Sequence, residues 1–227
     1  MNTIYLISGL GADWRMFRFL KLPEHLKRHH VDWITPQHIN EPLHDYAHCL
    51  KQQITEPHPI LIGLSYGGLV AIELAKTLQP CKTIIISSLA TRHDLPLYYH
   101  ALSKTKLHIW APLKLLQSAL PLAPWFFGAH TGEDIKLLKH VILDIDEKFL
   151  RWSLGQMLNW QQHDVLPGLV QIHGTADRVL PLRDRPGLIK VAGGGHLMVM
   201  NRADEISAIL NKILKYDEQE QIHHNYP

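Results

Sequence analysis

The chain has 227 residues and a formal net charge of +2 at pH 7, and it is 46% hydrophobic and 19% charged. This length suits one α/β domain, and this composition is typical of a globular protein and excludes disordered and fibrous classes. The basic residues form no dense stripe, so no nucleic acid partner is expected, and the two cysteines, Cys49 and Cys81, stand in no CxxC or metal-ligand spacing and are expected to be reduced thiols.

The first part of the sequence alternates apolar runs with amphipathic segments. The predicted elements are a strand at 4–8, a helix at 13–28, a strand at 31–35, a helix at 41–55, a strand at 60–64, a helix at 66–78 and a strand at 83–87. The isoleucines of the last strand indicate burial on both faces, as in a parallel sheet covered by helices. The order of elements therefore predicts an α/β fold.

The alternation stops between residues 91 and 165, where no strand-like run occurs and Trp, Tyr, Phe, Leu and Pro are frequent. It resumes with strands at 169–173 and 188–191 and a final helix at 202–216. We therefore expect a core at 1–90 and 166–217, a helical cap inserted at 91–165, and a flexible tail at 218–227.

Neither the N-terminus nor the cap carries a clear membrane signal. The opening MNTIYLISGLGAD has no basic region and too short an apolar run for a signal peptide, so a cytoplasmic location is expected. The most lipid-like stretch, residues 107–127, is interrupted by one lysine and three prolines. It is interpreted as pocket-lining or interfacial structure, without stable membrane insertion.

Ser65 stands between Gly63 and Gly67 at the junction of a predicted buried strand and a helix. A serine on such a sharp turn projects its Oγ from the carboxyl edge of the sheet, and only small neighbours let the turn close. The same turn opens the helix, so the amide of Tyr66 lies where unpaired donors favour a developing oxyanion. The pattern indicates a nucleophile, although a glycine-rich turn without chemistry has the same spacing.

A serine nucleophile needs a base and a carboxylate that orients it. Asp177 follows the strand at 169–173, and His196 follows the strand at 188–191. The order Ser65, Asp177, His196 is that of one known catalytic architecture. Asp94 and Asp184 remain alternatives for the acid, and Asp177 could instead cap a turn.

The segments ISGLGADWRMF, GLSYGG, IHGTADRVLP and GGGH together resemble the α/β-hydrolase fold superfamily over nearly the whole chain outside the insertion. The resemblance implies a three-layer α/β/α sandwich with a mostly parallel sheet of about six strands and a helical cap. It implies Ser65 as nucleophile, His196 as base and then acid, Asp177 as the orienting carboxylate, and the amides of Leu10 and Tyr66 as the oxyanion hole.

The sequence departs from that family in two places. The residue before the first glycine of the oxyanion loop is commonly His, whereas here it is Ser8, which puts the bracing of that loop in question. The sequence also begins at the strand that carries this loop, so the leading antiparallel hairpin is expected to be missing.

The function that these motifs predict is a serine hydrolase that cleaves an ester-like bond of a small hydrophobic substrate through an acyl-enzyme. Thioester, C–C bond, amide or perhydrolase chemistry on the same triad is an alternative, as is a ligand-binding homologue without turnover. Aromatic residues of the cap are candidates to line the substrate pocket, although any one of them taken alone is more often ordinary core: Trp110, Trp125, Phe126 and Trp152.

No cofactor or metal is expected. The sequence contains no GxxxxGK[ST] loop, and SGLGAD lacks the full GxGxxG spacing. His44 and His48 share a helical face, but no HExxH motif or third ligand accompanies them, so they are interpreted as a solvated face. The motifs do not determine the oligomeric state.

Overall fold

The computed structural model describes residues 3–106, 111–112, 114, 118 and 120–224. Its sheet is formed by the strands β1 (Thr3–Ile7), β2 (Lys27–His30), β3 (Ile60–Leu64), β4 (Lys82–Ile86), β5 (Leu169–Gly174) and β6 (Ile189–Val191). The strands lie in the order β2-β1-β3-β4-β5-β6, and each neighbouring pair is parallel. The predicted α/β fold with a parallel sheet of six strands is confirmed.

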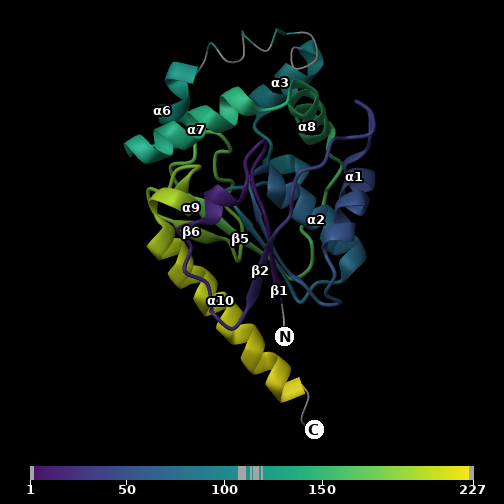
Figure 1. The fold of residues 1–227 in the computed structure, drawn as a ribbon, viewed down its shortest axis with the longest axis vertical. Helices are drawn as coiled ribbons and strands as arrows, with labels where there is room; N and C mark the ends of the chain where they lie inside the picture. Colours follow the sequence, from purple (N-terminus) through teal and green to yellow (C-terminus); the bar gives the residue numbers. More distant parts are fainter. Residues whose placement is uncertain (1–2, 107–110, 113, 115–117, 119, 225–227) are drawn as a thin grey trace.

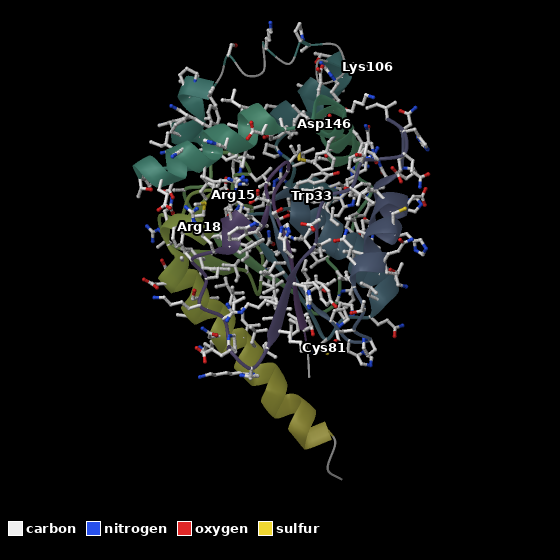
Figure 2. The ribbon with its side chains drawn as sticks, viewed as in Figure 1. Arg15, Arg18, Trp33, Cys81, Lys106 and Asp146 are labelled. Carbon is white, nitrogen blue, oxygen red and sulfur yellow. The ribbon has the colours of Figure 1, made fainter. Side chains whose placement is uncertain are left out.

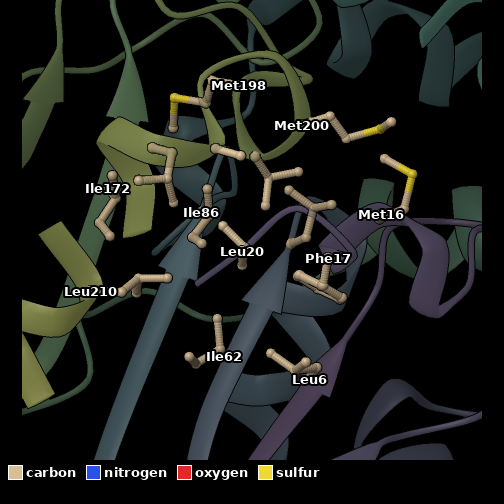
Figure 3. Close-up of a cluster of buried hydrophobic side chains, with 14 of the residues drawn as sticks. Leu6, Met16, Phe17, Leu20, Ile62, Ile86, Ile172, Met198, Met200 and Leu210 are labelled. Atoms are coloured by element: carbon tan, nitrogen blue, oxygen red, sulfur yellow. The ribbon is translucent and has the colours of Figure 1, made fainter. Parts of the chain in front are cut away.

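Helices cover both faces of the sheet (Figure 1). The core helices are α1 (Leu43–Leu50), α2 (Tyr66–Leu78), α9 (Met198–Asn201) and α10 (Ala203–His224), with the 3-10 turns η1 (Trp14–Phe17) and η2 (Lys51–Gln53). Because side chains alternate along a strand, one hydrophobic cluster forms on each face. Ile62 and Ile86 meet α9 and α10 (Figure 3), whereas Leu61 and Ile85 meet α1 and α2.

The segment between β4 and β5 folds over one end of the sheet (Figure 1). Its described elements are η3 (Arg92–Asp94), α3 (Leu97–Thr105), η4 (Leu120–Leu122), α6 (Ala123–Phe127), α7 (Gly132–Asp144) and α8 (Glu147–Asn159). In Figure 1, β1 begins near the mark N and runs toward these helices. Because the strands are parallel, the helices lie at the carboxyl edge of the sheet. That edge is where open α/β sheets bind ligands.

The predicted helix at 13–28 is wrong. Asp13 accepts a hydrogen bond from the amide of Arg15 and so starts only the short turn η1. Pro23 then interrupts the segment, because proline lacks the amide donor that a helix interior needs. The chain turns at this point, and the Leu26 amide donates a hydrogen bond to the Pro23 carbonyl. Five apolar side chains of this segment are nevertheless buried without a long helix: Met16, Phe17, Leu20, Leu22 and Leu26.

The second strand is also displaced from its predicted position at 31–35 to Lys27–His30. This edge strand is largely exposed and polar, so hydrophobic periodicity could not reveal it. Its pairing with β1, Thr3 opposite Lys27 through Leu6 opposite His30, is what defines it. Elsewhere β3 and α2 have the predicted bounds, and α10 continues to His224, past the predicted end at Tyr216.

Candidate active site

Ser65 lies at the junction of β3 and α2 in a strained backbone conformation, with φ 51° and ψ −120°. Its two glycine neighbours are required by close contacts. A Cβ on Gly63 would lie 2.6 Å from the Cα of Gly68, and a Cβ on Gly67 would overlap the carbonyl oxygens of Ile7 and Ser8. Such strain is characteristic of functional sites, and here it holds Oγ above the carboxyl edge of the sheet.

The structure brings Ser65, His196 and Asp177 into one hydrogen-bonded chain. His196 Nε2 lies 2.8 Å from Ser65 Oγ, and His196 Nδ1 lies 2.8 Å from Asp177 Oδ2. With Nδ1 donating to the carboxylate, Nε2 is free to accept the serine proton, which is the tautomer that a general base needs.

The loops that carry Asp177 and His196 are held side by side by backbone contacts. The Thr175 amide donates to the Val191 carbonyl at 3.0 Å, and the Ala176 amide donates to the Gly194 carbonyl at 2.9 Å. The loops that follow the neighbouring strands β5 and β6 are thus joined directly by backbone hydrogen bonds.

Asp177 is buried, and its second oxygen accepts hydrogen bonds from the amides of Val179 and Leu180, each at 2.9 Å. Burial by itself would raise the pKa of Asp177. The facing His196 ring, the hydrogen bonds from His173 and His196 and the Leu180 amide outweigh it and hold the pKa well below its usual value. The carboxyl group is therefore ionised under ordinary conditions.

The two alternative carboxylates are engaged elsewhere. Asp94 accepts hydrogen bonds from the amides of Ala90 and Thr91 and forms an ion pair with Arg185. Asp184 pairs with Lys190 on the surface. Of the three candidate acids, Asp177 is the one that contacts His196.

Leu10 and Tyr66 both line the cavity above Ser65, and Tyr66 directly follows Ser65 in the chain. Within the described part of the chain, neither amide donates a hydrogen bond. Tyr66 opens α2, so the positive end of that helix points at the same place. The pair can therefore supply two donors to an oxyanion.

The loop that carries Leu10 is braced by two side chains. The Ser8 hydroxyl donates to the Ala12 carbonyl at 2.6 Å, and the Trp33 indole donates to the carbonyls of Gly9 and Ala12 at 3.2 and 3.0 Å. Ser8 therefore supplies part of the bracing that the sequence left in question. The sequence analysis did not identify Trp33 as a bracing residue, because its neighbours in the sequence do not indicate a partner in a distant loop. Figure 2 shows Trp33 below the start of α8.

A cavity of about 330 Å³ opens over Ser65 and His196. Its walls are mainly aliphatic side chains, many of them from α7 and α8, with Tyr66, Tyr99 and Phe127 as the aromatic members. The Phe127 ring packs at 78° to the His196 ring, with centroids 5.4 Å apart.

The predicted pocket aromatics need correction. Trp125 and Phe126 are 59% and 45% exposed, and Trp125 packs under the Arg178 guanidinium, outside the cavity. Trp152 is buried in the second hydrophobic cluster and donates to the Glu41 carbonyl. Trp110 lies outside the described residues. A long apolar segment indicates burial near the site but not which way each ring points.

Among the described residues, no group of three or more His, Cys, Asp or Glu side chains could hold a metal ion. His44, one of the pair with helical spacing, contacts the neighbouring Asp45 on the surface. None of the described helices is both long enough and apolar enough to cross a membrane.

The model of the alpha/beta hydrolase family matches residues 4–209. Among solved structures, an esterase from Exiguobacterium antarcticum is similar, with 16% identity, a TM-score of 0.68, and coverage of 96% of this chain and 92% of the esterase. A hydrolase from Oleispira antarctica has 16% identity, a TM-score of 0.69, and coverage of 95% and 91%. A meta-cleavage product hydrolase from Pseudomonas fluorescens has 16% identity, a TM-score of 0.67, and coverage of 95% and 91%. No curated protein matches the chain.

Proposed function

The chain belongs to the alpha/beta hydrolase family, and from that premise we propose that it is a serine hydrolase that cleaves an ester-like bond of a small hydrophobic substrate. The observation that carries the proposal is the hydrogen-bonded chain from Ser65 Oγ through the His196 ring to Asp177. The three side chains come from three different loops, and two of them, Ser65 and His196, line the floor of an apolar cavity.

The first half of the proposed reaction forms an acyl-enzyme. Ser65 Oγ attacks the carbonyl carbon while its proton passes to His196 Nε2, and the amides of Leu10 and Tyr66 stabilise the oxyanion. The carbon–oxygen bond to the alcohol then breaks, and His196 returns the proton to the departing oxygen. Asp177 stays ionised and stabilises the imidazolium that exists between these two proton transfers.

The second half repeats the steps with water. His196 takes a proton from a water molecule, the hydroxide oxygen attacks the acyl carbon, and the bond to Ser65 Oγ breaks as His196 gives it the proton. The products are a carboxylic acid and the free enzyme. No oxidant, reductant or metal enters the balance.

The test is intact-mass analysis after treatment with a small fluorophosphonate, on wild type, Ser65→Ala and His196→Ala. An activated serine gives one adduct in wild type, none in Ser65→Ala, and labelling slowed by orders of magnitude in His196→Ala. Absence of an adduct on folded wild-type protein would contradict the proposal and favour a ligand-binding role.

A pair of matched substrates separates ester from thioester chemistry. An ester and a thioester with the same acyl group form the same acyl-enzyme, so they share the deacylation step and differ only in acylation. A higher kcat/KM for the ester, lost in Ser65→Ala, supports esterase activity; a clear preference for the thioester would overturn the ester assignment while leaving the serine mechanism intact.

A further inference from the structure

The cavity over Ser65 has walls from the hydrophobic clusters of both faces of the sheet. Leu138, Leu197 and Met200 belong to the cluster on the α9 and α10 face. Leu69 belongs to the cluster on the α1 and α2 face, and Met157 packs against it. The cavity therefore has walls from both faces of the sheet, and we call the part lined by each of these two sets of residues a lobe.

The lining of this cavity is neutral. Apart from Ser65, His196 and the hydroxyls of Tyr66 and Tyr99, none of the side chains that line it carries a polar group. A charged group bound there would lose its hydration without gaining a partner. The cavity thus favours a neutral substrate with alkyl groups on both sides of the reacting carbonyl.

His196 decides which lobe receives which group. Its Nε2 must return the proton to the departing oxygen, so the alkoxy group must lie on the side of the imidazole that faces the cavity. Leu197 and Met200 follow His196 in the chain, and Phe127 packs on its ring. These residues belong to α6 and to the start of α9, on the same face of the sheet as Leu138, and this assigns that lobe to the alkoxy group.

The opposite lobe is then left for the acyl chain. Leu69 stands one turn after Ser65 on α2, and Leu154 and Met157 of α8 also line the cavity. A volume of about 330 Å³ shared between two lobes is near the lower end of the ~300–1,000 Å³ usual for ligand pockets. This size suits alkyl groups of short to medium length.

We propose that the substrate is a neutral aliphatic ester bound in two lobes. The acyl chain occupies the lobe formed by Leu69, Leu154 and Met157, and the alkoxy group occupies the lobe formed by Leu138, Leu197 and Met200. This inference rests on the proposed hydrolase function and adds to it the substrate class and the residues that set chain length.

Two series of esters test the assignment. In one the acyl chain is lengthened with the alcohol kept as ethanol; in the other the alcohol is lengthened with the acyl group kept as butyryl. Met157→Phe narrows the acyl lobe and should lower kcat/KM for the longest accepted acyl chain about tenfold, with little effect on the alcohol series. Met157→Ala should shift the acyl optimum to longer chains.

Leu138→Phe and Leu138→Ala are the matching pair for the other lobe, and they should change the alcohol series and leave the acyl series unchanged. Leu143→Phe is the control, because Leu143 lies on the same helix as Leu138 but is 52% exposed. It should change neither profile.

The fluorophosphonate adduct on Ser65 is measured for every variant and separates the two levels of the proposal. Loss of the adduct in wild type overturns the hydrolase function itself. If the adduct is normal but the Met157 variants alter the alcohol series and the Leu138 variants alter the acyl series, the lobe assignment is overturned. A normal adduct with both profiles unchanged in all four variants overturns the aliphatic pocket.

Discussion

At the residue scale, Trp33 is a side chain whose importance depends entirely on a distant loop. Its indole nitrogen bonds the carbonyls at both ends of the turn Gly9–Ala12, and its ring packs 5.9 Å from that of Tyr66. One residue thus contacts both segments that carry the proposed oxyanion donors. Trp33 touches no reacting atom, so its expected role is to position the Leu10 amide.

Replacement of Trp33 by Phe should keep most of the packing and remove both hydrogen bonds. We expect kcat to fall about tenfold with KM nearly unchanged, since a donor that is misplaced in the transition state lowers the rate more than ground-state binding. Steady-state kinetics on a short ester measure this. Trp14→Phe is the control, because Trp14 is 60% exposed; equal kinetics in both variants would contradict the positioning role.

Asp177 provides a prediction on pH. Its pKa is depressed in the folded protein, so the ionised carboxylate stabilises the fold above the unfolded value of about 3.9, and this stabilisation is lost as pH falls through the folded value. Asp177→Asn cannot titrate. The difference in unfolding free energy, wild type minus Asp177→Asn, should therefore decrease below about pH 4.

Denaturant unfolding between acid and neutral pH measures that difference, and a difference that grows toward acid pH would contradict the depressed pKa. At neutral pH the same variant should lose about 10⁴-fold in kcat, because Asn favours the wrong tautomer of the histidine. Asp184→Asn, on the surface, should leave kcat unchanged.

At the element scale, the junction of β3 and α2 depends on glycine for space. A Cβ on Gly67 would meet the backbone oxygens of Ile7 and Ser8, which cannot move without disturbing β1 and the oxyanion loop. The tight packing of these elements is thus part of the site, since it holds Ser65 in its positive-φ conformation.

Gly67→Ala should therefore lower the free energy of unfolding by about 2 kcal/mol and reduce activity with it. Gly132→Ala is the matched control, because nothing lies within 4 Å of the Cβ it would gain in the first turn of α7. That variant should stay within about 0.5 kcal/mol of wild type. Chemical denaturation compares the two, and similar losses would show that glycine is not required for space at the junction.

At the scale of the whole molecule, the cavity joins the core to the helices that cover the carboxyl edge of the sheet. Ser65 and His196 form its floor, while α7 and α8 contribute much of its wall. An alkyl group attached to Ser65 would bury its surface against both parts at once. Occupation of the cavity should therefore stabilise the entire fold.

Covalent phosphonate adducts of Ser65 that differ only in alkyl length test this at the global level. A hexyl adduct should raise the Tm above that of a methyl adduct, because each added methylene that becomes buried contributes up to about 0.8 kcal/mol. Thermal unfolding followed by circular dichroism measures the difference. A Tm that is independent of chain length would mean that the alkyl group stays in solvent.

Local patterns were sufficient for the central elements and the three candidate triad residues. The strand Ile60–Leu64 and the helix Tyr66–Leu78 are marked by a continuous apolar run, a glycine turn and helical periodicity, and all three signals are local. Asp177 and His196 could be proposed because each follows a strand, and in a parallel sheet the strand ends share one edge.

The sequence by itself determined the central strands and helix from β3 to β4, the turn at Ser65 and the choice of residues able to form a triad, because these depend on neighbours in the chain. Tertiary structure decided the edge strand Lys27–His30, the bracing by Trp33 and the aliphatic lining of the cavity. Each of these depends on a contact with a distant segment. The sequence shows which side chains are apolar or polar. Only tertiary packing determines which distant side chain or strand each of them contacts.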